Sequence, residues 1–398
     1  RFGLRVILRN WSHFLTLFFG ICFGSLLLVF AFCLIPTMTH YAESRAADIP
    51  ANHIYGPKAP LELDGTASQR EAYEAAETLA TTKDLTSIAP ERLLSMMLQA
   101  QTVDRDAHAV NTRENDSDAV AQAEKVTIES LQTPRNFSDS NEDVSVYGIP
   151  EHSRYWTGVD VSDGRVVVGG GLARKCGVAA GEDHDFTDKY SGKTHTLHVD
   201  EVNDSITDTS MYMSIDACNE LFGEDADYFN AYASDAALDL NPRYLATEVT
   251  PESMDAIADQ MQNSMGSIAR VIGFVAVPIY LVLMYLLTKT VIDRSARAIS
   301  YMKVFGYEDR EIDRLYVRSI SVTVVVSIIL ALPLIIASLG GILSVAMSSY
   351  GGYMQAYVPL SSFLGEIALG IAVYTVVAFL HVRRIRRVPL SLAMKVQE

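Results

Sequence analysis

The order of apolar and polar positions divides the chain into four long hydrophobic runs and one large polar segment. The runs cover residues 14–36, 271–289, 319–347 and 360–382. A bilayer core about 30 Å thick needs roughly 20 apolar residues in a helix, so the pattern predicts four transmembrane helices. The first run is longer than the apolar part of a signal peptide and no small-residue cleavage site follows it, so we expect a retained anchor.

A different pattern precedes the first run. Arg1, Arg5 and Arg9 recur every four residues and form one charged stripe, while Trp11 lies away from it. This pattern predicts an amphipathic helix over residues 1–13 that rests on the membrane surface. Because the chain begins with Arg1 and not with Met, we also expect it to be a piece of a longer protein.

The polar segment, residues 37–265, changes its periodicity along its length. Residues 62–132 are acidic and rich in Ala, Glu and Gln at helical spacing, and Ser68 followed by Glu71 predicts a capping box at the start of a helix. The helical pattern of this part extends through "DSDAVAQAEKVTIESLQ", residues 116–132.

A strand pattern follows over residues 144–246, where Asp163-Gly164 predicts a tight hairpin between two Val-rich strands. Residues 250–270 have helical spacing and predict a stalk helix that continues into the second span. The fold class is therefore an integral membrane protein: an α-helical four-span bundle with a large α+β extracytoplasmic domain inserted between spans 1 and 2.

Charge follows the same division of the chain. Residues 1–36 carry three arginines and no acid, residues 37–265 carry 16 basic against 41 acidic side chains, and residues 266–398 carry 13 against 7. The basic side chains near the spans form three clusters, before span 1, between spans 2 and 3, and after span 4. Short loops on the cytoplasmic side of a membrane are enriched in Lys and Arg. A four-span topology places all three clusters on the same side, which is therefore predicted to be cytoplasmic.

That topology assigns each connection to one side of the membrane. Both termini, the loop 290–318 and the basic tail 383–398 are predicted to be cytoplasmic. The polar segment 37–265 and the short loop 348–359 are predicted to lie outside.

Several fragments suggest catalysis or metal binding, and each fails on spacing. "SGKT" at residues 191–194 lacks the glycine that a phosphate-binding loop needs five positions earlier, where Thr187 stands. His195 and His198 lie an odd number of residues apart on a predicted strand, so they point to opposite faces. No nucleophile, base and orienting group can be assembled. We therefore expect no enzymatic activity, no cofactor, no metal and no nucleic-acid partner.

The cysteines of the outer segment and one acid leave alternatives open. Cys176 and Cys218 could form a disulfide or remain two separate thiols, because sequence alone does not place their Cβ atoms. Glu366 is the one acid within a predicted span. An intramembrane acid suggests a proton or ion relay, and hydration at the interface or a packed polar neighbour is the alternative.

The segment between spans 2 and 3 keeps apolar residues among its charges. Ile299, Met302 and Phe305 recur at about helical spacing before Gly306, and Ile312 follows it. Gly306 predicts a tight turn between two helices. An apolar face outside a span must be covered, either by the membrane surface or by a docked protein.

The layout of a span, a large outer domain and three further spans resembles the FtsX-like (MacB-type) permeases of ABC transporters. The turn "ISYMKVFGYEDREIDRLYV" and the tail "RRIRRVPLSLAMK" carry most of this resemblance. "GRVVVGGGLARKCGVAAGE" in the outer domain also resembles a recurring family segment, whereas residues 62–132 look like a subfamily insertion.

The resemblance implies a permease subunit in the bacterial plasma membrane that is driven by a separate cytoplasmic ABC ATPase. Such subunits work as paired four-span units, either two permease halves or a homodimer, in the lipid bilayer. The turn would seat on the ATPase, and the stalk would carry motion to the outer domain for export, extraction or signalling. The implied coupling residues are Arg297, Ile299, Met302, Lys303, Phe305, Gly306, Arg310, Glu311, Ile312 and Arg314.

Other functions fit parts of the same layout. A membrane-anchored receptor or sensor would also have an outer domain and a cytoplasmic docking turn, but its partner would not be an ATPase. An ion-coupled transporter would need several charged or broken spans, and only Glu366, Pro278 and Pro333 point that way. The sequence does not specify the substrate.

Overall fold

The computed structural model describes residues 11–103, 108–136, 139–347 and 352–386. The chain forms two compact units. The helical unit contains Arg1–His40, Asp259–Ser344 and Gln355–Glu398, and the outer domain contains Tyr41–Ala258 together with Val345–Met354. The amphipathic helix predicted over residues 1–13 falls almost wholly outside the described residues, as does most of the basic tail.

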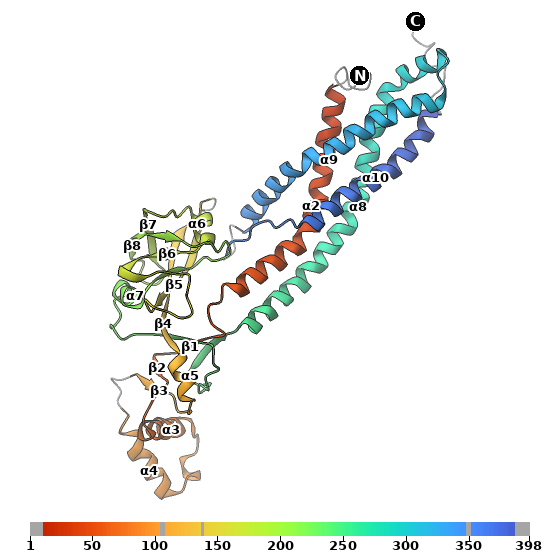
Figure 1. The fold of residues 1–398 in the computed structure, drawn as a ribbon. Helices are drawn as coiled ribbons and strands as arrows, with labels where there is room; N and C mark the ends of the chain where they lie inside the picture. The colour runs from red at the N-terminus through yellow and green to blue at the C-terminus, as the bar shows by residue number, and fades with distance from the viewer. Residues whose placement is uncertain (1–10, 104–107, 137–138, 348–351, 387–398) are drawn as a thin grey trace. The chain divides into compact units, whose positions relative to one another are not determined.

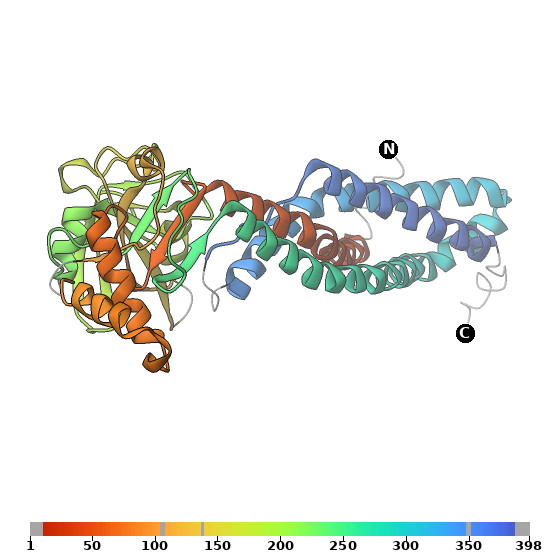
Figure 2. The same cartoon turned by 90° about the horizontal axis from the view of Figure 1, so that it is seen from below.

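In the described part of the helical unit, four long helices lie side by side (Figures 1 and 2). They are α2 (Trp11–Ala47), α8 (Pro251–Val304), α9 (Asp309–Met347) and α10 (Leu360–Arg386). Each contains a stretch long and apolar enough to cross a membrane: Phe18–Ala47, Gly266–Ala296, Ile320–Ala346 and Leu360–Arg383. The four spans predicted from hydropathy are therefore present in the described chain.

These helices are apolar on nearly all faces. Their shared core contains Tyr280, Val324 and Val377, each 2% exposed or less. Equally apolar side chains face outward, including Phe274 at 81% and Leu360 at 71% exposed. A helix that is hydrophobic all round belongs in a buried or lipid environment, so the outward side chains are suited to acyl chains.

The outer domain is built on a mixed ten-stranded sheet. The strand order is β12-β1-β11-β4-β5-β10-β6-β9, and β7 pairs with both β4 and β8. The strands are β1 (His53–Pro57), β4 (Glu124–Pro134), β5 (Asn141–Ile149), β6 (Val167–Val168), β7 (Glu182–Asp188), β8 (Thr194–Val199), β9 (Glu201–Val202), β10 (Met211–Ser214), β11 (Ala231–Ser234) and β12 (Leu245–Val249). A separate parallel pair joins β2 (Leu61–Glu62) to β3 (Ala109–Val110).

The described residues of this domain also form five α-helices: α3 (Ala67–Thr81), α4 (Pro90–Ala100), α5 (Ser117–Gln122), α6 (Gly170–Cys176) and α7 (Ile215–Phe222). The capping box of α3 lies two residues earlier than predicted. Thr66 is the N-cap, and Gln69 supplies the reciprocal bond to the Thr66 backbone at 2.9 Å. Ser68 and Glu71 instead lie within the helix, because Thr66 and Gln69 satisfy the same spacing rule two residues earlier.

The helix expected across residues 116–132 is wrong beyond Gln122. The chain turns at Ala123 and becomes the long strand β4. Val126, Thr127 and Ile128 are β-branched, and strand pairing with β5 and β11 buries the first two of them. Tertiary pairing therefore overrides the Ala- and Glu-rich helical pattern at this point.

The hairpin predicted at Asp163-Gly164 is also wrong. Residues 162–164 form a single 3-10 turn with Asp163 at φ 55°, and the segment before it has no strand. After the turn only Val167–Val168 joins the sheet, where it pairs with β10 and β9 instead of with a neighbour in sequence. The Asp-Gly pair makes the turn that its residue types favour, but the partner strands come from elsewhere in the chain.

Candidate functional site

Backbone hydrogen bonds and a glycine define the conformation of the turn between α8 and α9. α8 ends in a Schellman motif: the N–H of Tyr307 donates to the carbonyl of Met302 at 3.2 Å, and that of Gly306 donates to Lys303 at 3.2 Å. Gly306 has φ +87°, a conformation that side chains with a Cβ rarely adopt. The turn predicted from Gly306 is therefore observed.

The start of α9 is capped by its own acids. The carboxylate of Glu311 accepts the backbone N–H of Glu308 at 3.3 Å, and the carbonyl of Glu308 accepts the N–H of Ile312 at 3.2 Å. This is half of a capping box, and the negative charges also complement the positive end of the helix dipole. Together the two caps fix the geometry of the reversal.

The apolar residues predicted to contact a partner divide into two groups. Ile299 and Ile312 are 0% and 1% exposed and belong to the core of the helical unit, and Met302 is half-buried against that core. The prediction that Ile299 and Met302 fill a groove on a partner needs correction, because both face the neighbouring helices. Phe305 behaves differently and is 79% exposed.

The exposed apolar surface at this turn consists of Tyr301, Val304, Phe305 and Tyr307, which we call the turn face. Their exposed fractions are 43%, 57%, 79% and 53%. Three of these residues were missed from the sequence, although the spacing 301, 304 and 305 places them on one helical face and Tyr307 follows the glycine. The side chains of Arg297, Arg310 and Arg314 lie outside the described set, and Lys303 is half-buried.

A buried ion cluster forms a second distinctive site, in the outer domain. Glu142 on β5 is 0% exposed, and its Oε2 contacts Arg135 Nε at 2.6 Å and Lys175 Nζ at 2.8 Å. The Arg135 and Lys175 side chains are 9% and 7% exposed. Charges that deep in a protein are tolerated only when they are paired and hydrogen-bonded.

The cluster binds the backbone of Gly352, which belongs to the segment between α9 and α10. Glu142 Oε1 accepts the Gly352 N–H at 3.0 Å, and Lys175 Nζ donates to the Gly352 carbonyl at 2.7 Å. Gly352 has φ +90°, and a Cβ placed there would lie 2.7 Å from the hydroxyl of Tyr41. The position therefore requires glycine, and the chain between two spans is fastened to the outer domain.

The two outer cysteines are free thiols and not a disulfide. Cys176 ends α6 and Cys218 lies in α7, and both belong to or pack against one hydrophobic core. Burial, together with the charge of Glu142, raises the pKa of Cys176 to about 12, and burial likewise raises that of Cys218 to about 12. Thiols with such pKa values are unreactive near neutral pH.

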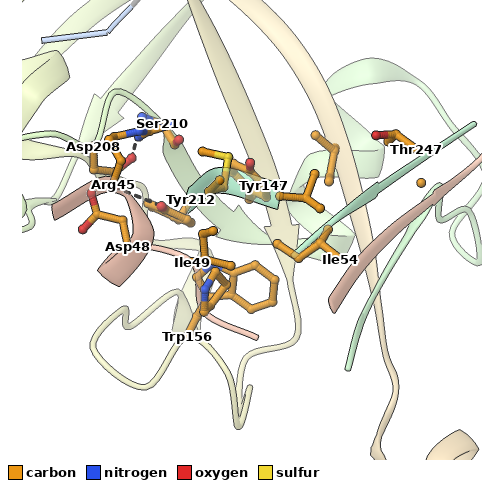
Figure 3. Close-up of a pocket in the computed structure, with 15 residues that line it drawn as sticks. Arg45, Asp48, Ile49, Ile54, Tyr147, Trp156, Asp208, Ser210, Tyr212 and Thr247 are labelled. Carbon is orange, nitrogen blue, oxygen red and sulfur yellow. Dashed lines mark hydrogen bonds between the residues drawn. The ribbon is translucent and has the colours of Figure 1, made fainter. Parts of the chain in front are cut away.

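A pocket lies within the outer domain, and its lining includes residues of α2 and α8 that belong to this domain (Figure 3). Its cavity volume is about 170 Å³. The lining residues are Arg45, Asp48, Ile49, Pro50, Ile54, Gly56, Ile128, Tyr147, Trp156, Asp208, Ser210, Tyr212, Thr247, Val249 and Met254. Sequence reasoning missed this pocket, because its walls come from segments up to about 200 residues apart.

Aromatic side chains form the inner wall of the pocket. The rings of Tyr147 and Tyr212 stack at 5.6 Å with an interplanar angle of 22°, and Trp156 is tilted against Tyr147 at 6.2 Å. The Tyr212 hydroxyl donates to Asp208 Oδ2 at 2.9 Å. Burial raises the pKa of Tyr147 and of Tyr212, so both hydroxyls stay protonated at physiological pH.

The fragments rejected from the sequence have structural roles. Gly192 of "SGKT" makes the turn of the β7–β8 hairpin at φ +69°. His198 contacts Asp183 Oδ1 at 2.7 Å across that hairpin. Among the described residues no group of three His, Cys, Asp or Glu side chains could hold a metal ion.

Glu366 lies inside α10 and is 5% exposed. Within the part of the chain that the structure describes, its Oε1 has no hydrogen-bond partner. Glu366 is therefore a buried acid inside the helical unit.

Comparison with known families agrees with the arrangement of the spans and the turn. Residues 270–390, which contain α9, α10 and most of α8, match the family described as FtsX-like permease C-terminal. The match therefore covers the part of the chain that holds three of the four candidate membrane spans. The chain carries an FtsX-like permease domain, which confirms the resemblance noted from the turn and the tail. No curated protein sequence gave a significant match.

Two solved structures are similar in part. The extracellular domain of the noncanonical ABC-type transporter YknZ from Gram-positive bacteria aligns at 19% identity with a TM-score of 0.21, covering 30% of this chain and 68% of its own. The periplasmic region of MacB from Actinobacillus actinomycetemcomitans aligns at 10% identity with a TM-score of 0.22, covering 54% and 95%. Scores this low support no conclusion about substrate or partners.

Proposed function

We propose that this chain is the permease subunit of an ABC transporter and that a separate cytoplasmic ATPase binds it at the turn between α8 and α9. The observation that carries the proposal is the turn face. Phe305 is 79% exposed on a turn whose two caps fix its backbone. An exposed aromatic cluster on a rigid element is suited to a protein partner, since it loses little conformational freedom on binding.

The continuity of the helix that ends at this turn supports the same function. α8 is one helix of 54 residues from Pro251 to Val304, roughly 80 Å long, so the stalk and the turn belong to a single element. Pro278 lies inside it and removes one helical hydrogen bond, which allows a bend at that position. Gly352 supplies a second attachment, from the α9–α10 connection to the outer domain.

We further infer the orientation and the assembly. The basic clusters favour a bacterial plasma membrane protein whose turn and termini are cytoplasmic and whose outer domain is extracytoplasmic. A second permease half or a second copy would complete the transporter. ATP-driven movement of the turn would then be used for export, extraction or signalling at the outer face.

The proposal is tested by co-purification of the full-length permease with its candidate ATPase. We expect Phe305→Asp to lower ATPase recovery at least tenfold, because a charge replaces the centre of the turn face. The matched control is Tyr190→Asp, which makes the same kind of change at an aromatic side chain that is 86% exposed in the outer domain. Size-exclusion profiles of both variants establish that they are folded.

The same experiment distinguishes the receptor alternative. Equal ATPase recovery by Phe305→Asp and the wild type would move the docking site elsewhere. If the wild-type permease captured no ATPase in any nucleotide state, the ABC transporter function would be rejected and a membrane-anchored sensor would remain.

A further inference from the structure

We propose that the pocket of the outer domain binds an apolar group that carries a carboxylate, with Arg45 as the residue that recognises the charge. The walls are made of aliphatic and aromatic side chains, among them Ile49, Ile54 and Tyr147 (Figure 3). Such a pocket, with a few polar groups in an apolar lining, is the usual form of a site for a small ligand.

The polar atoms left for a ligand are mainly donors. Among the described residues, Arg45 makes one hydrogen bond, from Nη1 to the Thr207 carbonyl at 3.3 Å, and no carboxylate of these residues lies within ion-pair distance of it. The Tyr147 hydroxyl and the indole N–H of Trp156 have no hydrogen-bond partner among the described residues. A guanidinium and two neutral donors around one cavity favour an acceptor, and best an anion.

The two acids of the lining are directed elsewhere. Asp208 is 3% exposed and accepts hydrogen bonds from Ser210 N, Tyr212 Oη and Asn203 Nδ2 at 2.8 to 2.9 Å. Asp48 accepts the Thr207 hydroxyl at 2.6 Å, and its carboxylate points away from Tyr147 (Figure 3). These hydrogen bonds hold the two carboxylates against the 203–212 segment, and Arg45 is the positively charged side chain of the lining.

The size of the cavity limits the apolar part of the ligand. Its volume of about 170 Å³ is below the range of about 300–1,000 Å³ that holds a drug-sized molecule. The cavity suits one large side chain or a short acyl segment. Two sources share this chemistry: the C-terminal residue of a peptide and the carboxylate end of a fatty acid.

The lining of the pocket includes residues of both α2 and α8, the two helices that continue into the spans. Arg45 lies in the last turn of α2, and Met254 lies in the first turns of α8. A bound ligand would contact both of them. Ligand binding itself does not depend on the ATPase, whereas any effect of the ligand on transport rests on the function proposed above.

Trp156 provides a direct test, because Trp11 is the only other tryptophan of the chain. Full-length Trp11→Phe protein in lipid nanodiscs is titrated with hexanoate and with N-acetyl-phenylalanine while Trp156 fluorescence is recorded. The matched neutral probes are hexanamide and N-acetyl-phenylalaninamide. We expect saturable changes at about millimolar concentrations for at least one acid, and binding roughly tenfold weaker or more for its amide.

Substitutions in the same background identify the recognising residue. Arg45→Gln should weaken the acid roughly tenfold or more while leaving the amide unchanged, and Tyr147→Phe should weaken both slightly. The matched control is Arg113→Gln, an exposed arginine that pairs with Asp239 elsewhere in the domain. A preference for N-acetyl-phenylalanine identifies a peptide end, and a preference for hexanoate identifies an acyl chain.

Three outcomes would overturn the proposal. Equal affinity for the acid and its amide would reject recognition of the carboxylate, and an Arg45→Gln protein with unchanged acid binding would reject the assigned residue. A linear, non-saturating response to every probe would mean that the molecules partition into the lipid, so that the pocket binds no ligand of this class. None of these results depends on whether an ATPase is bound.

Discussion

Glu142 accepts a hydrogen bond from the backbone N–H of Gly352 at 3.0 Å, although 210 residues separate the two in the chain. One partner lies on β5 in the sheet of the outer domain, and the other lies in the connection between two membrane helices. Lys175 holds the other side of the same residue through its carbonyl. A buried charge cluster thus fixes a loop that hydropathy alone would classify as a simple reversal.

Replacing Glu142 by Gln should strongly destabilise the outer domain. The change removes the negative charge and leaves Arg135 and Lys175 buried beside each other, and removing one partner of a buried ion pair costs about 3–5 kcal/mol. The measurement is thermal unfolding of the full chain in the Trp11→Phe background, followed by Trp156 fluorescence. Glu151→Gln, at an exposed acid of the same domain, should change the free energy of unfolding by less than about 0.5 kcal/mol. Equal stability of the two variants would contradict the importance of the cluster.

Gly352→Ala should lower stability by about 1–3 kcal/mol, because alanine must adopt a positive φ and its Cβ approaches the Tyr41 hydroxyl. Tyr41→Phe removes that hydroxyl. The double variant should therefore be more stable than the sum of the single changes predicts, by about 0.5 kcal/mol or more. Strict additivity would show that the contact with Tyr41 does not limit this position.

The outer thiols should resist alkylation at neutral pH. With pKa values of about 12, Cys176 and Cys218 remain protonated up to high pH, so at pH 8 only about one thiol in 10,000 is a thiolate. N-ethylmaleimide should label them roughly 1,000-fold more slowly in the folded chain than in urea, and the rate should rise about tenfold per pH unit. The reference is a cysteine introduced at an exposed site by Tyr190→Cys.

Mass spectrometry after labelling in urea without a reductant supplies the control for this experiment. Two added maleimides on the outer domain are expected. Their absence, with labelling restored by a reductant, would reveal a disulfide and contradict the structure.

Glu366→Gln and Glu366→Leu should leave transport intact. The buried carboxyl has an oxygen without a partner among the described residues, so removing it should raise the free energy of unfolding by about 1–3 kcal/mol or leave it unchanged. The measurements are thermal stability and the ATPase activity of the assembled transporter at several pH values. A loss of activity in a stable Glu366→Gln protein would instead support the proton-relay alternative.

Local patterns in the amino-acid sequence were enough to predict the spans, the turn at Gly306 and the resemblance to FtsX-like permeases. Hydropathy and the conformational preference of glycine act locally, so they can be read without knowing which distant residues meet. Local patterns failed where pairing partners were distant. β4 became a strand because β5 and β11 lie beside it, and Val167–Val168 found its partners far from the Asp163-Gly164 turn.

Only the tertiary structure decided which side chains of the predicted sites face solvent and which face one another. Helical spacing placed Ile299 and Phe305 in one group, but the core of the helical unit buries Ile299 and leaves Phe305 exposed. The cluster at Glu142 and the pocket around Arg45 gave no signal in the sequence, because each is assembled from segments that only the folded sheet brings together. Burial is a property of the whole fold, and it is burial that turns these ordinary charged residues into sites.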